Sequence, residues 1–283
     1  MFTNLIHERY FKFLRRRLIN IIFGFMSFKD FTKWYSETGK LKIFWAKVVK
    51  SIDLLSKENG STLINVKWII KNKIKETAIA IVERQQEISK IIKSFNRHSN
   101  ITKILIVPEN LPVNLNLVNA RSILYFWKIN AKTLEPNKNV KVKIYHEWSE
   151  NELKIFRSIH KKSWGFFVPP RPEDHVVILG YLNNTPVAMA YLNIHNFNID
   201  YGIHVVKAYW RRRIGTKLLV ELLKLAKTMN AHNVSVVRIF RSIRGTSSDI
   251  RAVKFYKANN PLIRLSIYRI AVESSEELRK ILI

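Results

Sequence analysis

The residues best suited to chemistry lie between Ile203 and Leu219, where an apolar strand pattern passes through a basic loop into a helical pattern. The first backbone N–H groups of a helix have no intrahelical partners and lie at the positive end of its dipole. Arg211, Arg212 and Arg213 add three positive charges just before this helix. The junction is typical of a phosphate-binding site, although an arginine run before a helix can also be a solvated surface.

A second segment of interest is a predicted helix further along the chain. Asp249, Ala252 and Tyr256 recur at helical spacing and share one face of it, with Phe255 beside them. Taken alone, such a face is an ordinary buried surface. A phenol that faces a reactive centre has another use, because its ordinary pKa near ~10 keeps it protonated at neutral pH and able to act as an acid.

Together the two segments resemble the Gcn5-related N-acetyltransferases (the GNAT superfamily). The first is similar to that family's coenzyme A loop, V-x-P-x-[YF]-[QR]-x-x-G-x-[GA] running into a helix, with Tyr209 and Gly215 in register. Trp210 stands at the Gln/Arg position, and Arg213 replaces the first glycine. The second is similar to the family's N-x-x-A-x-x-F-Y-x-x-x-G-F helix, with Asp249 in place of the asparagine.

The resemblance implies an N-acetyltransferase that moves an acetyl group from acetyl-CoA, its cosubstrate, to a primary amine on a small molecule or a protein. It implies no metal, and it assigns Tyr256 as the acid that protonates the departing thiolate. It further implies a set of residues that contact the acetyl-CoA. These are Ile203, His204, Val205, Val206, Arg211, Arg212, Arg213, Ile214, Gly215, Thr216 and Asp249.

In this family the strand before the loop splays from its neighbour and the thioester lies in the gap. The backbone of Ile203–Val206 would then pair with the pantetheine amides, and an N–H near Val206 would polarise the thioester carbonyl. No general base is marked. Asp200, His204 and Glu173 are candidates, and a lone histidine on a strand is more often structural.

The segment from Ser158 to Glu173 resembles the H-x-x-x-W-G-F-x-P-x-x-x-E segment of acetyltransferases related to mycothiol synthase. Members of that branch carry two acetyltransferase repeats, the first often without a working cofactor loop. The first half of this chain would suit such a degenerate repeat. Its loop Val82–Glu87 has no glycine and two carboxylates, and should not hold a pyrophosphate.

Apolar periodicity predicts an α+β fold for residues 137–283, with the order β-α-βββ-α-β-α-β. The resemblance makes this the GNAT fold, a mixed and mostly antiparallel sheet flanked by helices. The expected strands are Val140–Tyr145, Val176–Tyr181, Val187–Leu192, Ile199–Val206, Val234–Phe240 and one or two within Leu262–Val272. Three helices are expected. The first begins at a capping box from Ser149 to Glu152, and the other two span Gly215–Met229 and Ser248–Ala258. Asn183–Pro186 is an expected hairpin turn.

Residues 1–136 are expected to form a helical and degenerate GNAT-like α/β domain, ending at the linker Leu134–Asn139. Helical patterns occupy two segments near the start, Phe11–Ile22 and Leu41–Leu55. A βαβ unit with a parallel strand pair, and then a last strand, are expected to follow. Their segments are Thr77–Val82, Glu83–Phe95, Ile104–Val107 and Ile123–Trp127.

The composition is strongly basic, with 49 Lys and Arg against 21 Asp and Glu and a net charge of +28 spread over both halves. A cationic surface of this kind indicates weak, salt-sensitive binding of nucleic acid or other polyanions. Genome composition or a hot habitat explains the same charge without a partner. The absence of cysteine excludes disulfides and a cysteine nucleophile. Nothing indicates secretion, and a cytoplasmic location is expected.

The apolar segment Leu18–Phe28 follows three arginines but is shorter than the roughly 20 residues of a transmembrane helix. It lacks a small-residue cleavage site, so a core or domain-contact helix is expected, with a membrane-surface helix as the alternative. Three classes of function remain open: an N-acetyltransferase, a non-catalytic acyl-CoA-binding module on the same fold, and a nucleic-acid-associated protein.

Overall fold

The computed structural model describes residues 48–58, 61–70, 73–95 and 101–271, which form two compact units. The helix expected at 11–22 and the apolar segment 18–28 lie outside the described residues. Among the described residues, unit 1 takes those from 48 to 122, from 242 to 244 and from 265 to 271, and unit 2 takes Ile123–Arg241 and Gly245–Arg264. The boundary suggested between residues 136 and 137 remains a proposal, because packing contacts do not say which fragment folds alone.

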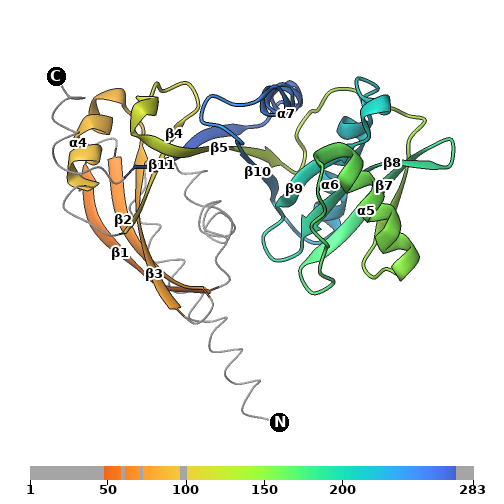
Figure 1. Cartoon of the computed structure of the whole chain (residues 1–283), viewed down its shortest axis with the longest axis horizontal. Coiled ribbons are helices and arrows are strands. Elements are labelled where there is room, and N and C mark those ends of the chain that lie inside the picture. The colour runs from red at the N-terminus through yellow and green to blue at the C-terminus, as the bar shows by residue number, and fades with distance from the viewer. Residues whose placement is uncertain (1–47, 59–60, 71–72, 96–100, 272–283) are drawn as a thin grey trace, which may run out of the picture. The chain divides into compact units, whose positions relative to one another are not determined.

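Unit 1 is built on a sheet with strand order β1-β2-β3-β4-β11 (Figure 1). Strands β1 to β3 form an antiparallel meander, and α4 then carries the chain to β4, which pairs parallel to β3. This is the βαβ unit that the sequence predicts. The elements are β1 (Val48–Glu58), β2 (Ser61–Ile70), β3 (Lys73–Val82), α4 (Gln85–Phe95), β4 (Thr102–Pro108) and β11 (Ile263–Ile270).

The helix expected from Leu41 to Leu55 is wrong for its described part, because residues 48–58 form β1 and pair with β2. Leu54 and Leu55 are 49% and 40% exposed, so the apolar spacing in this segment does not mark a buried helix face. Val48, Val49 and Ile52 are β-branched, which favours the strand. Pairing with a partner strand outweighs the local helical pattern.

Unit 2 contains the antiparallel sheet β6-β7-β8-β9. The turn between β7 and β8 is as predicted, because Asn183 and Asn184 have φ of 48° and 62°, as a two-residue type I′ hairpin requires. Asparagine tolerates this left-handed region better than most residues. The four strands are β6 (Lys141–Tyr145), β7 (His175–Leu182), β8 (Thr185–Asn193) and β9 (Ile199–Val205).

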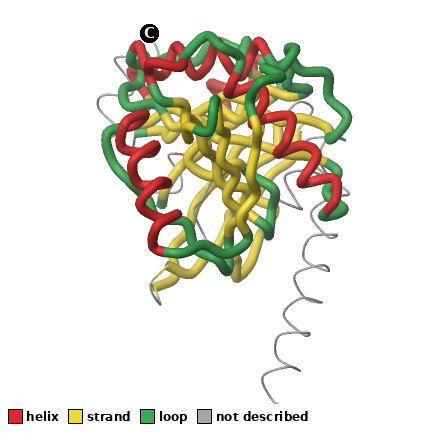
Figure 2. The backbone as a smooth tube through the Cα atoms, turned by 90° about the vertical axis from the view of Figure 1, so that its right-hand side faces the viewer, coloured by secondary structure: helices red, strands yellow, loops and turns green. Residues whose placement is uncertain are grey.

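Two further strands and three helices complete unit 2, in the predicted order (Figure 2 distinguishes helices, strands and loops by colour). Helix α5 begins with the predicted capping box, in which Ser149 and Glu152 each bond the other's backbone N–H. The elements are α5 (Glu150–Trp164), α6 (Ile214–Thr228), β10 (Asn233–Ile239), α7 (Ser247–Ala258) and the last residues of β5 (Val118–Lys128), which lies next to β10.

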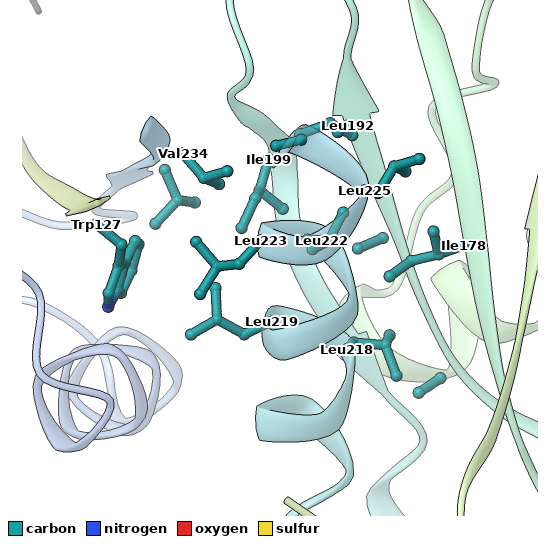
Figure 3. Packing of buried hydrophobic residues seen from close by; sticks show 14 of the residues in the cluster. Trp127, Ile178, Leu192, Ile199, Leu218, Leu219, Leu222, Leu223, Leu225 and Val234 are labelled. Carbon is teal, nitrogen blue, oxygen red and sulfur yellow. The ribbon is translucent and has the colours of Figure 1, made fainter. Parts of the chain in front are cut away.

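The sheet of unit 2 is covered on both faces. On one face, leucines of α6 pack against the strands and against Trp127 (Figure 3). On the other face, Phe156 and Ile159 of α5 pack against Met189 and Tyr191. The two faces therefore belong to different helices, and any molecule that reaches the middle of β9 must enter at the edge of that strand.

Candidate active site

Strands β9 and β10 separate soon after they begin. A single parallel bridge between Asn198 and Ser235 joins them, and the N–H of Ser235 donates to the carbonyl of Phe197 at 3.1 Å. Within the part of the chain that the structure describes, β9 belongs to the sheet of β8 while β10 belongs to that of β5. The splay that the family resemblance implies is therefore present, and one edge of β9 is left open beyond Asn198.

The open edge of β9 exposes the backbone of Ile203 and Val205. The N–H of Val206 donates to Val187 of β8 at 2.9 Å, so this residue faces β8. Because antiparallel pairs alternate, Val205 and Ile203 direct their N–H and C=O groups away from β8. The expectation that an N–H near Val206 polarises a thioester is therefore wrong for Val206 itself, whose N–H is already bonded.

A bulge in β9 turns one of these groups toward α7. The register with β8 shifts at Tyr201 and Gly202, whose φ angles are 63° and 89°. The next N–H, that of Ile203, donates to the hydroxyl of Tyr256 at 3.3 Å. A Cβ on Gly202 would lie 2.9 Å from that hydroxyl, so glycine is needed here for both the backbone angle and the close approach. A glycine inside a strand was the only sequence signal for the bulge.

Tyr256 is held rigidly at this edge. It is 3% exposed, and its ring packs against Tyr125 and Trp127 with centroids 5.1 and 6.0 Å away. Burial raises the pKa of its phenol, while the Ile203 hydrogen bond and the charge of Arg238 act in the opposite direction. The hydroxyl accepts the Ile203 bond with a lone pair and keeps its own proton, as a general acid must.

Asp249 lies on the same helix, with its carboxylate fully engaged. It accepts hydrogen bonds from the Arg238 side chain at 2.6 and 3.1 Å, from the Arg241 N–H, and from the N–H and hydroxyl of Thr246. Burial alone would raise the pKa of Asp249, but these bonds outweigh it and lower the pKa. The contacts indicate that Asp249 positions Arg238 and caps α7, and leave it no free oxygen for a cofactor. Sequence reasoning missed Arg238.

The basic loop leads from β9 to α6 through a 3₁₀ turn at Lys207–Tyr209. Arg211 and Arg213 both adopt the left-handed conformation, with φ of 62° and 55°. Arg213, which replaces the family's first glycine, therefore keeps a backbone angle that glycine favours. It is the N-cap of α6 and makes no side-chain cap, so the first N–H groups of the helix are available.

The guanidinium groups of this loop differ in their contacts. Arg213 donates to the backbone carbonyl of Glu135 at 3.3 Å, and Arg212 lies 5.6 Å over the ring of Tyr209. Arg211 is exposed. Asn137, which sequence reasoning did not single out, donates to the carbonyl of Arg212 at 2.8 Å and so fixes the loop from the segment before β6.

Gly215 has a packing role at the start of α6. A Cβ there would lie 3.0 and 3.1 Å from two ring atoms of Phe255 in α7, tighter than ordinary contact. Ile214 and Thr216 on either side are 1% and 2% exposed, so their side chains face the core. These three residues can therefore offer a phosphate only their backbone N–H groups. Trp210 closes the other end of the loop by donating to the Val205 carbonyl at 2.8 Å.

Residues 142–259 match the sequence model of the acetyltransferase (GNAT) family. Over this segment the chain is similar to that family. The segment holds all the elements that build the splayed edge, from β6 to α7, apart from the end of β5. The chain's resemblance to the mycothiol-synthase branch, and a degenerate repeat in the first half, remain proposals.

Solved structures resemble the chain loosely. A conserved protein of unknown function from Staphylococcus epidermidis has 12% identity, a TM-score of 0.43, and coverage of 77% of this chain and 93% of its own. A GCN5-related N-acetyltransferase from Sphaerobacter thermophilus has 10% identity, a TM-score of 0.42, and coverage of 82% and 84%. Saccharomyces cerevisiae N-myristoyltransferase with bound myristoyl-CoA has 11% identity, a TM-score of 0.28, and coverage of 74% and 66%. No curated protein matched significantly.

The α5 face of unit 2 contains two adjacent histidines. His204 of β9 bonds the Ser163 hydroxyl at 2.8 Å and meets the ring of His160, which is fully buried. Burial lowers the pKa of His160 to about 4. Burial, the neighbouring His160 and Arg238 lower the pKa of His204 well below its ordinary range, against a backbone hydrogen bond at Tyr201. Both imidazoles are therefore neutral at pH 7.

The other two candidate bases are Asp200 and Glu173. The carboxylate of Asp200 accepts bonds from His175 at 3.0 Å, Asn193 at 3.0 Å and Asn198 at 2.8 Å, which makes it a structural centre of the β8–β9 turn. Glu173 is exposed in the loop before β7.

Within the described residues, no cluster of three or more His, Asp or Glu could hold a metal, and no helix is both long and apolar enough to cross a bilayer.

Proposed function

We propose that unit 2 is an N-acetyltransferase that binds acetyl-CoA and transfers its acetyl group to a primary amine. The observation that carries the proposal is the meeting of the Tyr256 hydroxyl and the Ile203 N–H on the open edge of β9. An acid and a hydrogen-bond donor there face the same small region. Acyl transfer needs both, because charge moves onto the carbonyl oxygen and then onto the leaving sulfur.

The loop supports the placement of the coenzyme. The free N–H groups at the start of α6 and the exposed Arg211 favour a pyrophosphate. From there the pantetheine arm would run along β9. The gap-facing C=O of Ile203 and N–H of Val205 offer one acceptor and one donor to its two amides.

The chemical step would be direct attack. The amine nitrogen forms a bond to the acetyl carbon, the carbonyl oxygen replaces the Tyr256 hydroxyl as the acceptor of the Ile203 N–H, and the C–S bond breaks. The thiolate then takes the proton of Tyr256, and the proton that the acylated nitrogen loses returns to the Tyr256 oxygen through water. The raised pKa of this buried phenol keeps it protonated at neutral pH, so its proton is available to the departing thiolate.

A non-catalytic acyl-CoA-binding module is a second candidate, favoured by one observation. Two of the four gap-facing backbone groups already have side-chain partners, since Tyr256 bonds the Ile203 N–H and Trp210 bonds the Val205 carbonyl. In a module of this kind, acetyl-CoA would bind but no acetyl group would move.

Calorimetric titration with acetyl-CoA, followed by an acetylation assay on a panel of primary amines, tests the proposal. We expect one acetyl-CoA per chain and release of free CoA thiol only when an amine is present. An absence of binding would reject both candidates. Binding without turnover on any amine would favour the module.

A further inference from the structure

The indole of Trp210 lies on the open edge of β9. Its Nε1–H donates to the carbonyl of Val205 at 2.8 Å. That carbonyl points away from β8, because the N–H of Val206 donates to Val187 of β8 and the backbone groups of an antiparallel strand alternate in direction. A hydrogen-bond donor must lie on the side to which its acceptor points. The indole is therefore on the gap side of β9, where the proposed function places the pantetheine arm.

A guanidinium holds this indole from the other side of the gap. Arg251 of α7 lies over the Trp210 ring with its Cζ 3.9 Å from the ring centroid, well within the roughly 6 Å reach of a cation–π contact. Arg251 is exposed, and among the described residues its guanidinium makes no ion pair and no hydrogen bond. The stack therefore joins the loop after β9 to the helix that carries Tyr256.

The rest of the basic loop is anchored without the help of the indole. The carbonyl of Arg212 and the guanidinium of Arg213 are both bonded to the segment before β6. Arg211 lies between Trp210 and these anchors, and its φ of 62° is strained for a residue that has a Cβ. The indole can therefore turn about Arg211 while the start of α6 stays in place.

The indole and the coenzyme would use the same part of the strand edge. The N–H and C=O of one strand residue point to the same side, so an amide that bonds the Val205 N–H must lie beside the carbonyl that the indole already occupies. An indole is also wider than the ~3.3 Å rise of one strand residue, so it covers more than a single backbone group. Acetyl-CoA cannot lie along this edge until the indole leaves.

We propose that Trp210 and Arg251 form a latch that closes the open edge of β9, and that binding of acetyl-CoA opens it. The proposal rests on the proposed binding of acetyl-CoA at this edge. The closed latch satisfies the Val205 carbonyl and covers an edge that would otherwise be a template for pairing with another strand. Because acetyl-CoA must open the latch, the measured affinity includes the cost of opening, and a weaker latch gives tighter binding.

Calorimetric titration of the full chain with acetyl-CoA tests the indole first. Trp210→Phe keeps a ring for Arg251 but removes the Nε1–H, and we expect acetyl-CoA to bind about 3–10-fold more tightly than to the wild type. Trp148→Phe is the matched control, because Trp148 is another half-buried tryptophan of the same unit and packs on Phe156 of α5. The control should bind acetyl-CoA as the wild type does.

A second pair of variants tests the guanidinium. Arg251→Gln removes the stack and one positive charge, whereas Lys254→Gln removes one positive charge from an exposed position three residues further along α7. Attraction of the anionic coenzyme by overall charge affects both variants alike. The latch predicts that Arg251→Gln binds acetyl-CoA about 2–5-fold more tightly than Lys254→Gln. Both side chains are exposed, so neither change disturbs the core.

Nitrogen-15 NMR of the indole groups follows the latch directly. The chain has seven tryptophans, and the Nε1–H resonance that is missing from Trp210→Phe belongs to Trp210. We expect this N–H to be protected from hydrogen exchange in the absence of acetyl-CoA and to exchange faster in its presence.

Each outcome has a distinct meaning. A wild type that does not bind acetyl-CoA rejects the proposed function, and the latch with it. Normal binding that is no tighter in Trp210→Phe, or that is equal in Arg251→Gln and Lys254→Gln, overturns the latch alone. A Trp210 resonance that acetyl-CoA leaves unchanged, in a protein that binds it, does the same.

Discussion

Arg238 of β10 and Asp249 of α7 form a buried ion pair, with Nη2 and Oδ1 2.6 Å apart. The pair holds Arg238 in place, and its charge is a minor influence on both groups: burial raises the pKa of Tyr256 against it and lowers the pKa of His204 together with it. One salt bridge thus links α7, the helix that holds the proposed acid, to β10. The ion pair gives the Asp249 carboxylate, in the first turn of α7, a structural role, although neither of its oxygens is free to bind a cofactor.

Substitution of Asp249 should be costly. Asp249→Asn leaves the Arg238 charge, only 14% exposed, without its partner, and we expect a loss of about 3 kcal/mol in the free energy of unfolding. Thr246→Ala removes only the cap and should cost about 1 kcal/mol. Urea denaturation measures both. Equal losses in the two variants would show that the ion pair adds nothing beyond the cap.

Tyr256→Phe separates the acid from its packing role. The ring and its contacts with Tyr125 and Trp127 remain, so acetyl-CoA affinity should change little, while turnover should fall about 10²–10⁴-fold. Tyr181→Phe is the control: it also removes a phenol hydroxyl, but on β7, which β8 separates from β9. Steady-state kinetics with a working acceptor measures the effect. A near wild-type rate would mean that solvent, and not Tyr256, protonates the thiolate.

The bulge in β9 can be tested with two glycines of nearly equal backbone angle. Gly202 and Gly165 have φ of 89° and 91°, but a Cβ on Gly202 would lie 2.9 Å from the Tyr256 hydroxyl, whereas nothing lies within 4 Å of one on Gly165. Both alanine variants should lose about 1–2 kcal/mol of stability through the backbone angle. Only Gly202→Ala should also impair turnover, because it displaces the hydroxyl. Identical kinetics in the two variants would contradict the role of this contact.

The phosphate loop predicts a position-dependent effect of charge. Arg211→Gln removes an exposed guanidinium beside the start of α6, and we expect acetyl-CoA affinity to fall about 3–10-fold at low salt and less at high salt. Lys227→Gln removes the same charge from the last turn of α6, roughly 20 Å away along the helix, and should leave affinity unchanged. Equal effects would indicate attraction by overall charge alone. Gly215 is less suitable for this test, because any side chain there also presses on Phe255.

The buried histidines predict a loss of stability in mild acid. Burial lowers the pKa of His160 from 6.5 to about 4, so the unfolded chain binds a proton in a window where the folded chain does not. Stability is then complete above pH 6.5 and falls as the pH drops toward 4, by about 3 kcal/mol for this group. His204, which touches His160 from β9 and is itself affected by Arg238 of β10, adds to the same trend.

His160→Asn should flatten this pH dependence, because an amide oxygen can still accept the Val168 N–H but does not titrate. Thermal unfolding between pH 4 and pH 8 measures the effect. A wild-type curve that is flat between pH 4.5 and 6.5 would contradict the buried, neutral state of the pair.

The elements whose signals are local could be predicted from the sequence. The capping box at Ser149, the asparagine turn at Asn183 and the strand, loop and helix around Arg211–Arg213 all appear where their residue types predict them. Each depends on bonds between residues a few positions apart, which a short pattern can record. The strands and helix of the βαβ unit in the first half were predictable from their apolar patterns.

The tertiary structure alone decided which groups meet. The N–H of Ile203 finds a hydroxyl 53 positions away, Ser163 and His204 are 41 positions apart, and Trp127 bonds a carbonyl 132 positions away. No local pattern carries such pairings, because they arise only when strands and helices pack into layers. The same reason makes residues 48–58 a strand despite their helical spacing: a partner strand was available to satisfy their backbone bonds.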